Sequence, residues 1–316
     1  MIHCSPASRN ASVRRDPWQW IANTIGGPAD AIQYACVLEA TAPKAGNVHP
    51  VAKFDDLCFA DFVSAAEIAA IELTVASSGL GDRVHSLIDQ TRRRTNTNVN
   101  LGIALLFGPI VLAEEQQRPT SDSWTLNHWH DATSNVLLNI TKEQSHRLGQ
   151  AIAKASAGGM DGDYQPEDPS LDVQSLTDSF DVMAAMREAK NRDLIAVEYA
   201  NGFESFFADV VPTVETSVRE TGDLLSGISL AHLRLLADRG DSLIARKNGR
   251  QTEREIRKRA ERCVDDFQRS GNSGIGELES IKEFDAYLRS EAHRLNPGTT
   301  ADFIAAAVYV CLRMRS

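Results

Sequence analysis

The stretch Leu101-Gly-Ile-Ala-Leu-Leu-Phe-Gly-Pro-Ile-Val-Leu-Ala113 decides the fold class, because it is apolar on every side of a helix. A surface helix would carry one polar face, so this pattern predicts a central helix that other helices bury. Its 13 residues are too few to span a membrane, since a spanning helix needs roughly 20. Gly108 and Pro109 predict that the helix is kinked or shortened.

Helical periodicity continues on both sides of this stretch. Apolar residues at the spacing of one helix face are Phe59, Phe62, Val63, Ala66 and Ala70, and later Ile256, Ala260, Cys263 and Phe267. We find no alternating strand pattern and no internal repeat. The sequence therefore predicts an all-α fold, a single large multi-helix domain over residues 18–316. Polar residues 1–17 are predicted to form a disordered tail, and 157–178, with Gly158-Gly159 and two prolines, a loop and internal boundary.

The composition limits the classes of partner. Hydrophobic residues make up 42% of the 316 residues and charged residues 24%, which is typical of a globular protein. A net charge of −10 argues against nucleic acid and against an anionic membrane surface. The five cysteines are scattered, without metal-ligand spacing, and Cys36, Cys263 and Cys311 are predicted to be buried thiols. Without a secretory signal, this indicates a cytoplasmic protein with small-molecule ligands.

A polar stretch from Arg92 to Gly102 precedes the central helix. Amides at a helix N-terminus favour anions, so this stretch is a candidate phosphate site. Asn96, Asn98 and Asn100 would add neutral donors, and Gly102 would let a ligand approach the backbone. An asparagine-rich helix cap with solvated arginines explains the same residues and stays open.

A second unusual stretch, Thr41-Ala-Pro-Lys-Ala-Gly-Asn-Val-His-Pro50, follows a predicted helix that carries Glu39. It places Lys44 and Asn47 on a loop close to that glutamate. Lys44 could hold a phosphate as a point charge. Taken in isolation, a solvated lysine on an ordinary loop is the simpler interpretation.

Four further stretches carry polar side chains. Glu198-Tyr-Ala-Asn-Gly-Phe203 puts a carboxylate one turn before a glycine expected inside a helix. The segment Asp238-Arg-Gly-Asp-Ser-Leu-Ile-Ala-Arg-Lys247 combines acids, bases and a turn, and in isolation a solvated helix end is the simpler interpretation. The last helix is predicted to open at Asn296-Pro-Gly-Thr-Thr-Ala-Asp302, with Thr299 as N-cap. His128-Trp-His-Asp131 lacks a third ligand at a known spacing, so a surface loop is favoured over a metal site.

Taken in order, these motifs resemble the triphosphoribosyl-dephospho-CoA synthase family, which makes the prosthetic-group precursor of citrate lyase and malonate decarboxylase. The resemblance covers about residues 30–310. It rests on Ala42-Pro-Lys-Ala-Gly-Asn-Val48, Phe54-Asp-Asp-Leu57, Asp61-Phe-Val-Ser64, Thr95-Asn-Thr-Asn-Val-Asn-Leu-Gly102, Glu198-Tyr-Ala-Asn-Gly-Phe203, Asp241-Ser-Leu-Ile-Ala-Arg-Lys247 and Asn296-Pro-Gly-Thr-Thr-Ala-Asp302.

The resemblance implies an all-helical enzyme that uses ATP as a substrate, together with Mg²⁺. The 2′-hydroxyl of 3′-dephospho-CoA would attack C1′ of the ATP ribose, adenine would leave, and the triphosphate would stay on the transferred ribose. Partners would be small nucleotides, and the resemblance is compatible with a homo-oligomer.

The resemblance also implies roles for matching positions. The catalytic carboxylates would be Glu198, Asp56 and Asp302. Nucleotide and phosphate would be held by Lys44, Asn47, Asn96, Asn98, Gly102 and Arg246. The Mg²⁺ ligands would be Glu39, Asp55 and Asp241.

This chain departs from the family in three places, one of which is Arg246-Lys-Asn-Gly249, where the family reads Arg-Gly-Gly. The family reads Thr-Pro-Lys-Pro-Gly where this chain has Ala42-Pro-Lys-Ala-Gly46, and its Asn-Thr-His-Lys-Gly stretch has a lysine that is missing between Asn96 and Gly102. The chain looks closer to a branch found beside tetrahydromethanopterin-linked one-carbon genes. The alternative function is therefore a divergent paralogue with another acceptor, or a nucleotide- or pterin-binding role in that pathway. A purely structural helical partner is a third hypothesis.

Overall fold

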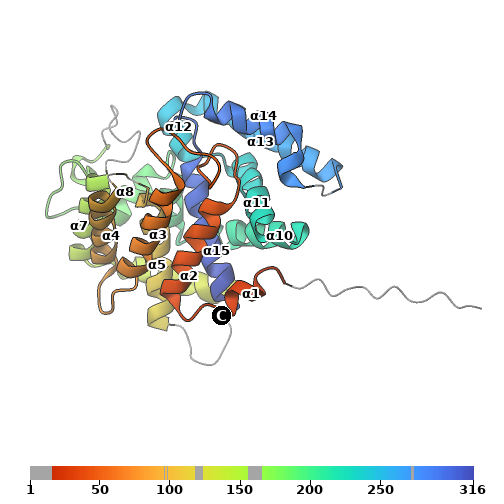
Figure 1. The fold of residues 1–316 in the computed structure, drawn as a ribbon. Helices are drawn as coiled ribbons and strands as arrows, with labels where there is room; N and C mark the ends of the chain where they lie inside the picture. The colour runs from red at the N-terminus through yellow and green to blue at the C-terminus, as the bar shows by residue number, and fades with distance from the viewer. Residues whose placement is uncertain (1–15, 96, 98, 118–123, 156–165, 272–273) are drawn as a thin grey trace, which may run out of the picture.

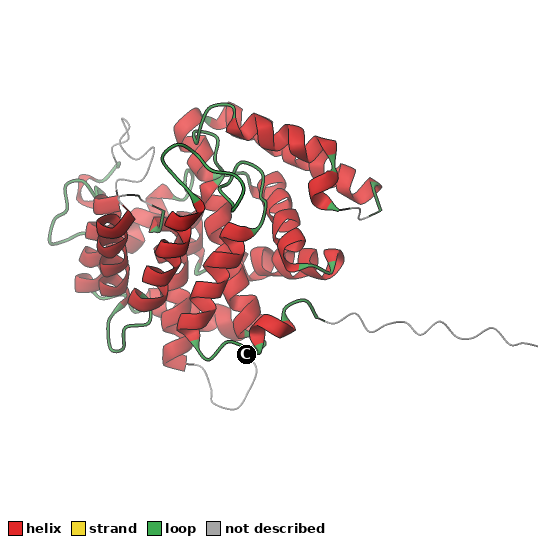
Figure 2. Ribbon diagram, in the orientation of Figure 1, coloured by secondary structure: helices red, strands yellow, loops and turns green. Residues whose placement is uncertain are grey.

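The computed structural model describes residues 16–95, 97, 99–117, 124–155, 166–271 and 274–316. These residues form fifteen α-helices, two short 3₁₀ helices and one π-helix, and none of them lies in a strand (Figure 2). The all-α prediction is confirmed.

The helix bounds give the order of the elements along the chain. They are α1 (Gln19–Ala22), α2 (Pro28–Thr41), α3 (Phe59–Glu72), α4 (Leu80–Thr95), α5 (Leu101–Gln117), α6 (Leu126–Leu138), α7 (Lys142–Ala155), η1 (Pro169–Leu171), α8 (Val182–Ala189), α9 (Leu194–Asn201), η2 (Phe206–Val210), α10 (Val211–Thr221), α11 (Leu224–Arg239), α12 (Ser242–Asn248), α13 (Arg250–Arg269), η3 (Ile275–Glu277), α14 (Glu279–Arg289) and α15 (Gly298–Arg313).

Two helices, α5 and α15, form the centre of the main core. Residues from Gly102 to Glu114 are all buried in α5, as the apolar pattern predicts. The helix α15 is buried almost throughout and packs against α2, α5, α10 and α11 (Figure 1). The two central helices bring their N-terminal ends to the same region, because a side chain of α15 lies against the first turn of α5.

Pro109 does not shorten α5, which continues to Gln117. A proline inside a helix leaves the carbonyl four residues earlier without its N–H partner. Here that carbonyl belongs to Leu105, and the hydroxyl of Tyr199 on α9 donates to it at 2.9 Å. Burial raises the pKa of Tyr199, so the phenol keeps its proton. A distant side chain thus replaces the missing backbone donor.

A second, smaller core joins α11 to α12, α13 and α14. Its buried residues include Leu233, Ile244, Phe267 and Leu288. Other residues of α11 belong to the main core, so this helix connects the two. In Figure 1, α12, α13 and α14 lie above α15, and α12 contacts α15 directly. This second core therefore holds a basic helix, α12, beside the start of the central helix α15.

Several local predictions are tested by the described residues. The segment His128-Trp-His-Asp131 lies in α6, so the loop prediction is wrong; Trp129 is fully buried there and anchors the helix. The cysteines Cys36, Cys263 and Cys311 are buried as predicted. No helix among the described residues is both long and apolar enough to cross a membrane.

The predicted tail and boundary fall partly outside the described residues. Of the tail, 1–15 lies outside, whereas Asp16 accepts a hydrogen bond from Arg315 at 2.8 Å and so belongs to the folded body. Of the predicted loop, 157–165 lies outside, and the rest contains η1 and turns, as a loop should.

Candidate functional site

A cavity of about 730 Å³ lies among the ends of α2, α3, α5, α8, α9, α12 and α15. Its volume is in the range of small-molecule sites. Six residues singled out from the sequence line it: Glu39, Asn47, Asp56, Gly102, Arg246 and Asp302. The motifs that are far apart in the sequence therefore meet at one place.

Two of the carboxylates that line the cavity are Glu39 from α2 and Asp302 from α15. Burial, and next the negative charge of Glu39, raise the pKa of Asp302 well above its usual value. Asp302 also lies against the first turn of α5, because a Cβ built on Gly102 would come within 1.9 Å of Asp302 Oδ2. Gly102 therefore makes room for a protein carboxyl group. The N-cap prediction for Thr299 is wrong, since α15 begins at Gly298.

Lys44 does not line the cavity but lies behind Glu39. Its side chain is 1% exposed, and its Nζ is 2.8 Å from Glu39 Oε1. The same Nζ donates to the backbone carbonyls of Glu39 and Ala42. The solvated-lysine interpretation is therefore wrong, and a direct contact between Lys44 and phosphate has no geometric support.

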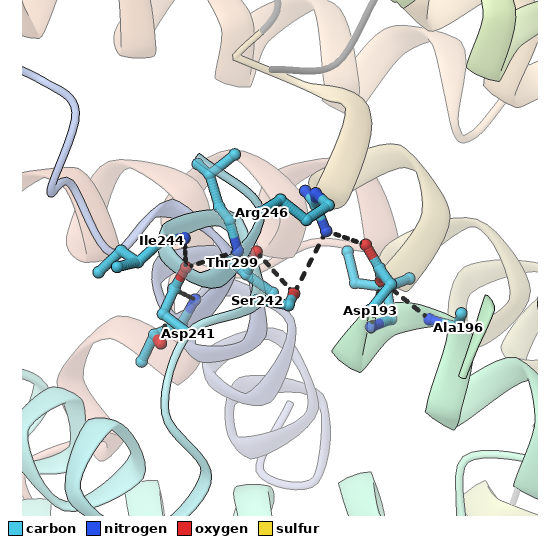
Figure 3. A network of polar contacts seen from close by, with 10 residues as sticks. Asp193, Ala196, Asp241, Ser242, Ile244, Arg246 and Thr299 are labelled. Atoms are coloured by element: carbon cyan, nitrogen blue, oxygen red, sulfur yellow. Dashed lines mark hydrogen bonds and ion pairs between the residues drawn. The ribbon is translucent and has the colours of Figure 1, made fainter. Parts of the chain in front are cut away.

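Two cations of α12, Arg246 and Lys247, line the cavity. Arg246 donates to the carboxylate of Asp193, the N-cap of α9, and lies 3.5 Å from the hydroxyl of Ser242 (Figure 3). Its neighbour Lys247 also lines the cavity and, among the described residues, has no hydrogen-bond or ion-pair partner. Burial, and next the charge of Arg246, lower the pKa of Lys247. This lysine is the cation with the most to gain from an anionic ligand.

Asp241 holds two helices together and has no contact with the cavity. Its Oδ1 caps α12 by accepting from the amides of Leu243 at 2.9 Å and Ile244 at 3.1 Å. Its Oδ2 accepts from the amide of Thr300 at 2.8 Å and the Thr300 hydroxyl at 2.9 Å, in the first turn of α15. Both oxygens are thus occupied by donors, which leaves none directed at a metal ion.

The three residues expected to bind Mg²⁺ are not gathered. Glu39 lines the cavity, Asp241 is used as a double cap, and Asp55 is exposed on the loop before α3, outside the cavity lining. Among the described residues, no group of three His, Cys, Asp or Glu side chains is arranged to hold a metal ion.

Glu198 is fully buried and does not line the cavity. Its carboxylate accepts from the Ser205 hydroxyl at 2.7 Å, from the Phe206 amide at 3.0 Å and from Arg239 at 2.5 Å. The expected mid-helix glycine, Gly202, instead ends α9 with φ of 71°. Glu198 therefore stabilises the turn that ends α9 and the start of the next helix. The geometry gives it no contact with a ligand.

The amides near the cavity divide into fixed and available groups. Asn100 is buried and donates to the carbonyl of Ala65 at 3.0 Å and the hydroxyl of Thr91 at 2.8 Å, so it joins α3 to α4. Asn47 donates to Asn296 Oδ1 at 2.8 Å, while its own Oδ1 has no partner within the described part of the chain. Asn96 and Asn98 lie outside the described residues. Asn47 lines the cavity, but its unpartnered Oδ1 is itself buried.

The sequence analysis missed Lys247, Asn296 and His293 at the polar end. His293 Nδ1 lies 3.3 Å from Asp56 Oδ1 at the rim. Lys247 is adjacent to Arg246 in a quoted motif, so it could have been found there. An apolar wall was also missed because its residues come from separate helices: Phe62, Ile103, Leu105, Ile152, Phe180, Met186 and Ile195.

Three comparisons with known proteins were made, of which two found matches to this chain. A search of curated proteins finds no significant match. A crystal structure from Archaeoglobus fulgidus, of a protein named as a triphosphoribosyl-dephospho-CoA synthase, has the same fold with a TM-score of 0.57 and 19% identity; the match covers 80% of this chain and 98% of that one. Residues 26–316 match the profile of the family described as ATP:dephospho-CoA triphosphoribosyl transferase. The chain therefore belongs to the ATP:dephospho-CoA triphosphoribosyl transferase family.

Proposed function

We propose that this protein transfers the triphosphoribosyl group of ATP to 3′-dephospho-CoA and releases adenine. The observation that carries the proposal is one cavity in which a pair of carboxylates, Glu39 and Asp302, lies together with the cations Arg246 and Lys247. Glycosyl transfer from ATP needs both, since positive charge develops at C1′ while a triphosphate must be held. The apolar wall is suited to a nucleobase.

The carboxylates divide the proton transfers between them. The acceptor oxygen forms a bond to C1′ and gives its proton to Glu39. The electron pair of the bond between C1′ and N9 leaves with adenine. Asp302, whose raised pKa favours the protonated form, gives its proton to the departing base. A proton passed from Glu39 to Asp302 resets the pair.

The triphosphate is assigned to the basic end of α12. Lys247 has no protein partner within the described residues, and Arg246 lines the cavity beside it. Both can donate to phosphate oxygens. Lys247 thereby takes the phosphate-binding role that the sequence suggested for Lys44.

Mg²⁺ is proposed as part of the MgATP substrate. The expected set of Glu39, Asp55 and Asp241 does not fit a protein-held ion, because two of these residues lie outside the cavity. Mg²⁺ keeps several waters and is bound largely by substrate phosphates in such sites. No step above depends on a protein-held metal.

The test is to incubate the purified protein with MgATP and 3′-dephospho-CoA, measure adenine by chromatography and detect the triphosphoribosyl product by mass. We expect adenine and product in equal amounts, and neither when the acceptor is left out. Adenine release without the acceptor would indicate hydrolysis, and no adenine in the complete reaction would overturn the proposal.

A further inference from the structure

We propose that Lys44 is a positioning residue: it holds the ionised carboxylate of Glu39 in place at the cavity wall and does not touch the substrate. The proposal rests on the function proposed above, because it gives Lys44 a role through Glu39. It differs from the role that a lysine in a nucleotide site usually suggests.

The first support is that the ammonium group has no donor left. A lysine has three N–H donors. In this structure Nζ lies within hydrogen-bond distance of three acceptors, the Glu39 carbonyl, the Ala42 carbonyl at 3.4 Å and Glu39 Oε1 at 2.8 Å. A phosphate oxygen would have to displace one of them.

The second support is the way in which α2 ends. The last carbonyls of a helix lack backbone partners, and cations are favoured there. α2 ends at Thr41, and the amide of Lys44 donates to the carbonyl of Ala42 at 2.8 Å. The chain therefore turns back at once, and the Lys44 side chain lies along the last turn, which carries Glu39.

The third support is that α14 clamps this turn. Gly46, at φ of 76°, donates its amide to Asp285 at 2.8 Å. Arg289, which pairs with Asp285, donates to the carbonyl of Asn47. A Cβ on Gly46 would come within 2.8 Å of Leu288. The turn that follows Lys44 is thus fixed to α14 at Gly46 and Asn47.

The fourth support is the charge balance around the pair. Glu39 is 7% exposed, and its other carboxylate oxygen has no hydrogen-bond partner among the described residues, so it is available to a substrate hydroxyl. His232 on α11 is buried near Lys44, and burial together with the charge of Lys44 lowers its pKa to about 3. His232 is therefore neutral and does not compete for Glu39.

The test is a double-mutant cycle of Lys44→Met and Glu39→Gln, with Lys247→Met as the matched lysine control. We expect Lys44→Met to lower kcat by about 10–100-fold, as loss of an orienting partner does, with KM for ATP within about twofold of wild type. In the Glu39→Gln background the same change should have no further effect. Lys247→Met should instead raise KM for ATP.

A merely structural lysine would lower activity equally in both backgrounds, and this outcome would overturn the proposal. So would a rise in KM for ATP in Lys44→Met equal to that in Lys247→Met. If Lys44→Met fails to fold, Lys44→Gln keeps donors for the carbonyls and is measured in the same cycle.

Calorimetric binding of MgATP separates this proposal from the proposed function. Wild type that binds MgATP but releases no adenine defeats the function. In that case, an affinity for MgATP that is unchanged in Lys44→Met but weakened in Lys247→Met still supports the proposal that Lys44 does not contact the nucleotide. A weakened affinity in both variants overturns it.

Discussion

Two buried ion pairs in this molecule invite comparison, Lys44 with Glu39 and Arg239 with Glu198. Each glutamate belongs to the last turn of a helix, and each pair lies close to the turn that ends that helix. Glu198 is 0% exposed and both of its oxygens accept from protein donors, whereas Glu39 keeps one oxygen at a cavity. In this molecule, a buried carboxylate in a sequence motif indicates a binding or catalytic role only when one of its oxygens has no protein donor.

The largest effect on activity is expected from Glu39→Gln. Removing the proton acceptor should lower kcat by about 10²–10⁴-fold, with a smaller loss of stability than in Glu198→Gln. Steady-state adenine release and thermal unfolding measure the two effects. Equal kcat losses in Glu39→Gln and Glu198→Gln would break the comparison.

The largest effect on stability is expected from Glu198→Gln. Arg239, whose side chain is 14% exposed, would lose its anion, which should lower the free energy of unfolding by up to about 3 kcal/mol, the lower end for a buried pair. Denaturant unfolding measures this, and kcat per folded molecule should stay within about twofold. A selective loss of kcat with unchanged stability would show that Glu198 touches substrate after all.

Gly102→Ala should have an intermediate effect on activity. The new Cβ would meet Asp302 and push its carboxyl group away, and a displacement of about 1 Å can cost about 10²-fold in rate. Gly276→Ala, where nothing lies within 4 Å of the added Cβ, is the matched control. Rates of adenine release for both variants decide whether the contact between α5 and α15 matters.

The smallest effect is a pH dependence from Asp302. Folding raises its pKa, so the folded state binds the proton more tightly than the unfolded chain does. The free energy of unfolding should therefore fall as pH rises from the unfolded pKa to the folded one. Asp302→Asn should lack this decline. Denaturant unfolding of wild type and Asp302→Asn from about pH 4 to about pH 8 measures this decline. Parallel curves of unfolding free energy against pH would contradict a raised pKa at Asp302.

Local sequence patterns predicted the helical fold of this protein but not the partners of its charged side chains. The buried helix from Leu101 to Ala113 followed from hydrophobicity alone, which depends on each residue's own chemistry. Lys44 pairs with Glu39, only five residues away, but the sequence does not show that tertiary packing buries this pair behind the cavity. Asp241 was misjudged because tertiary packing brings its partner to it. Thr300, which Asp241 caps, lies 59 residues away. Sequence spacing on one helix does not indicate which side of a cavity wall a side chain occupies.

Lys247, to which the proposed function assigns phosphate binding, shows the same limit of sequence-based prediction. It stands beside Arg246 in a motif that the sequence analysis quoted, yet nothing in that motif distinguishes a paired cation from an unpaired one. Arg246 is paired because α9 brings Asp193 to it. The distinction is made by α9 and α12 together and can be drawn only from the fold.

The hydrogen bond from Tyr199 to Leu105 has a consequence for how this sequence can evolve. Pro109 creates an acceptor that only a side chain from another helix satisfies. Replacing Tyr199 first would leave the buried carbonyl of Leu105 without a donor, at a cost of about 1–3 kcal/mol. Replacing Pro109 first would instead restore the backbone hydrogen bond to that carbonyl. Positions 109 and 199 should therefore covary among homologues, with the proline the earlier of the two to be replaced.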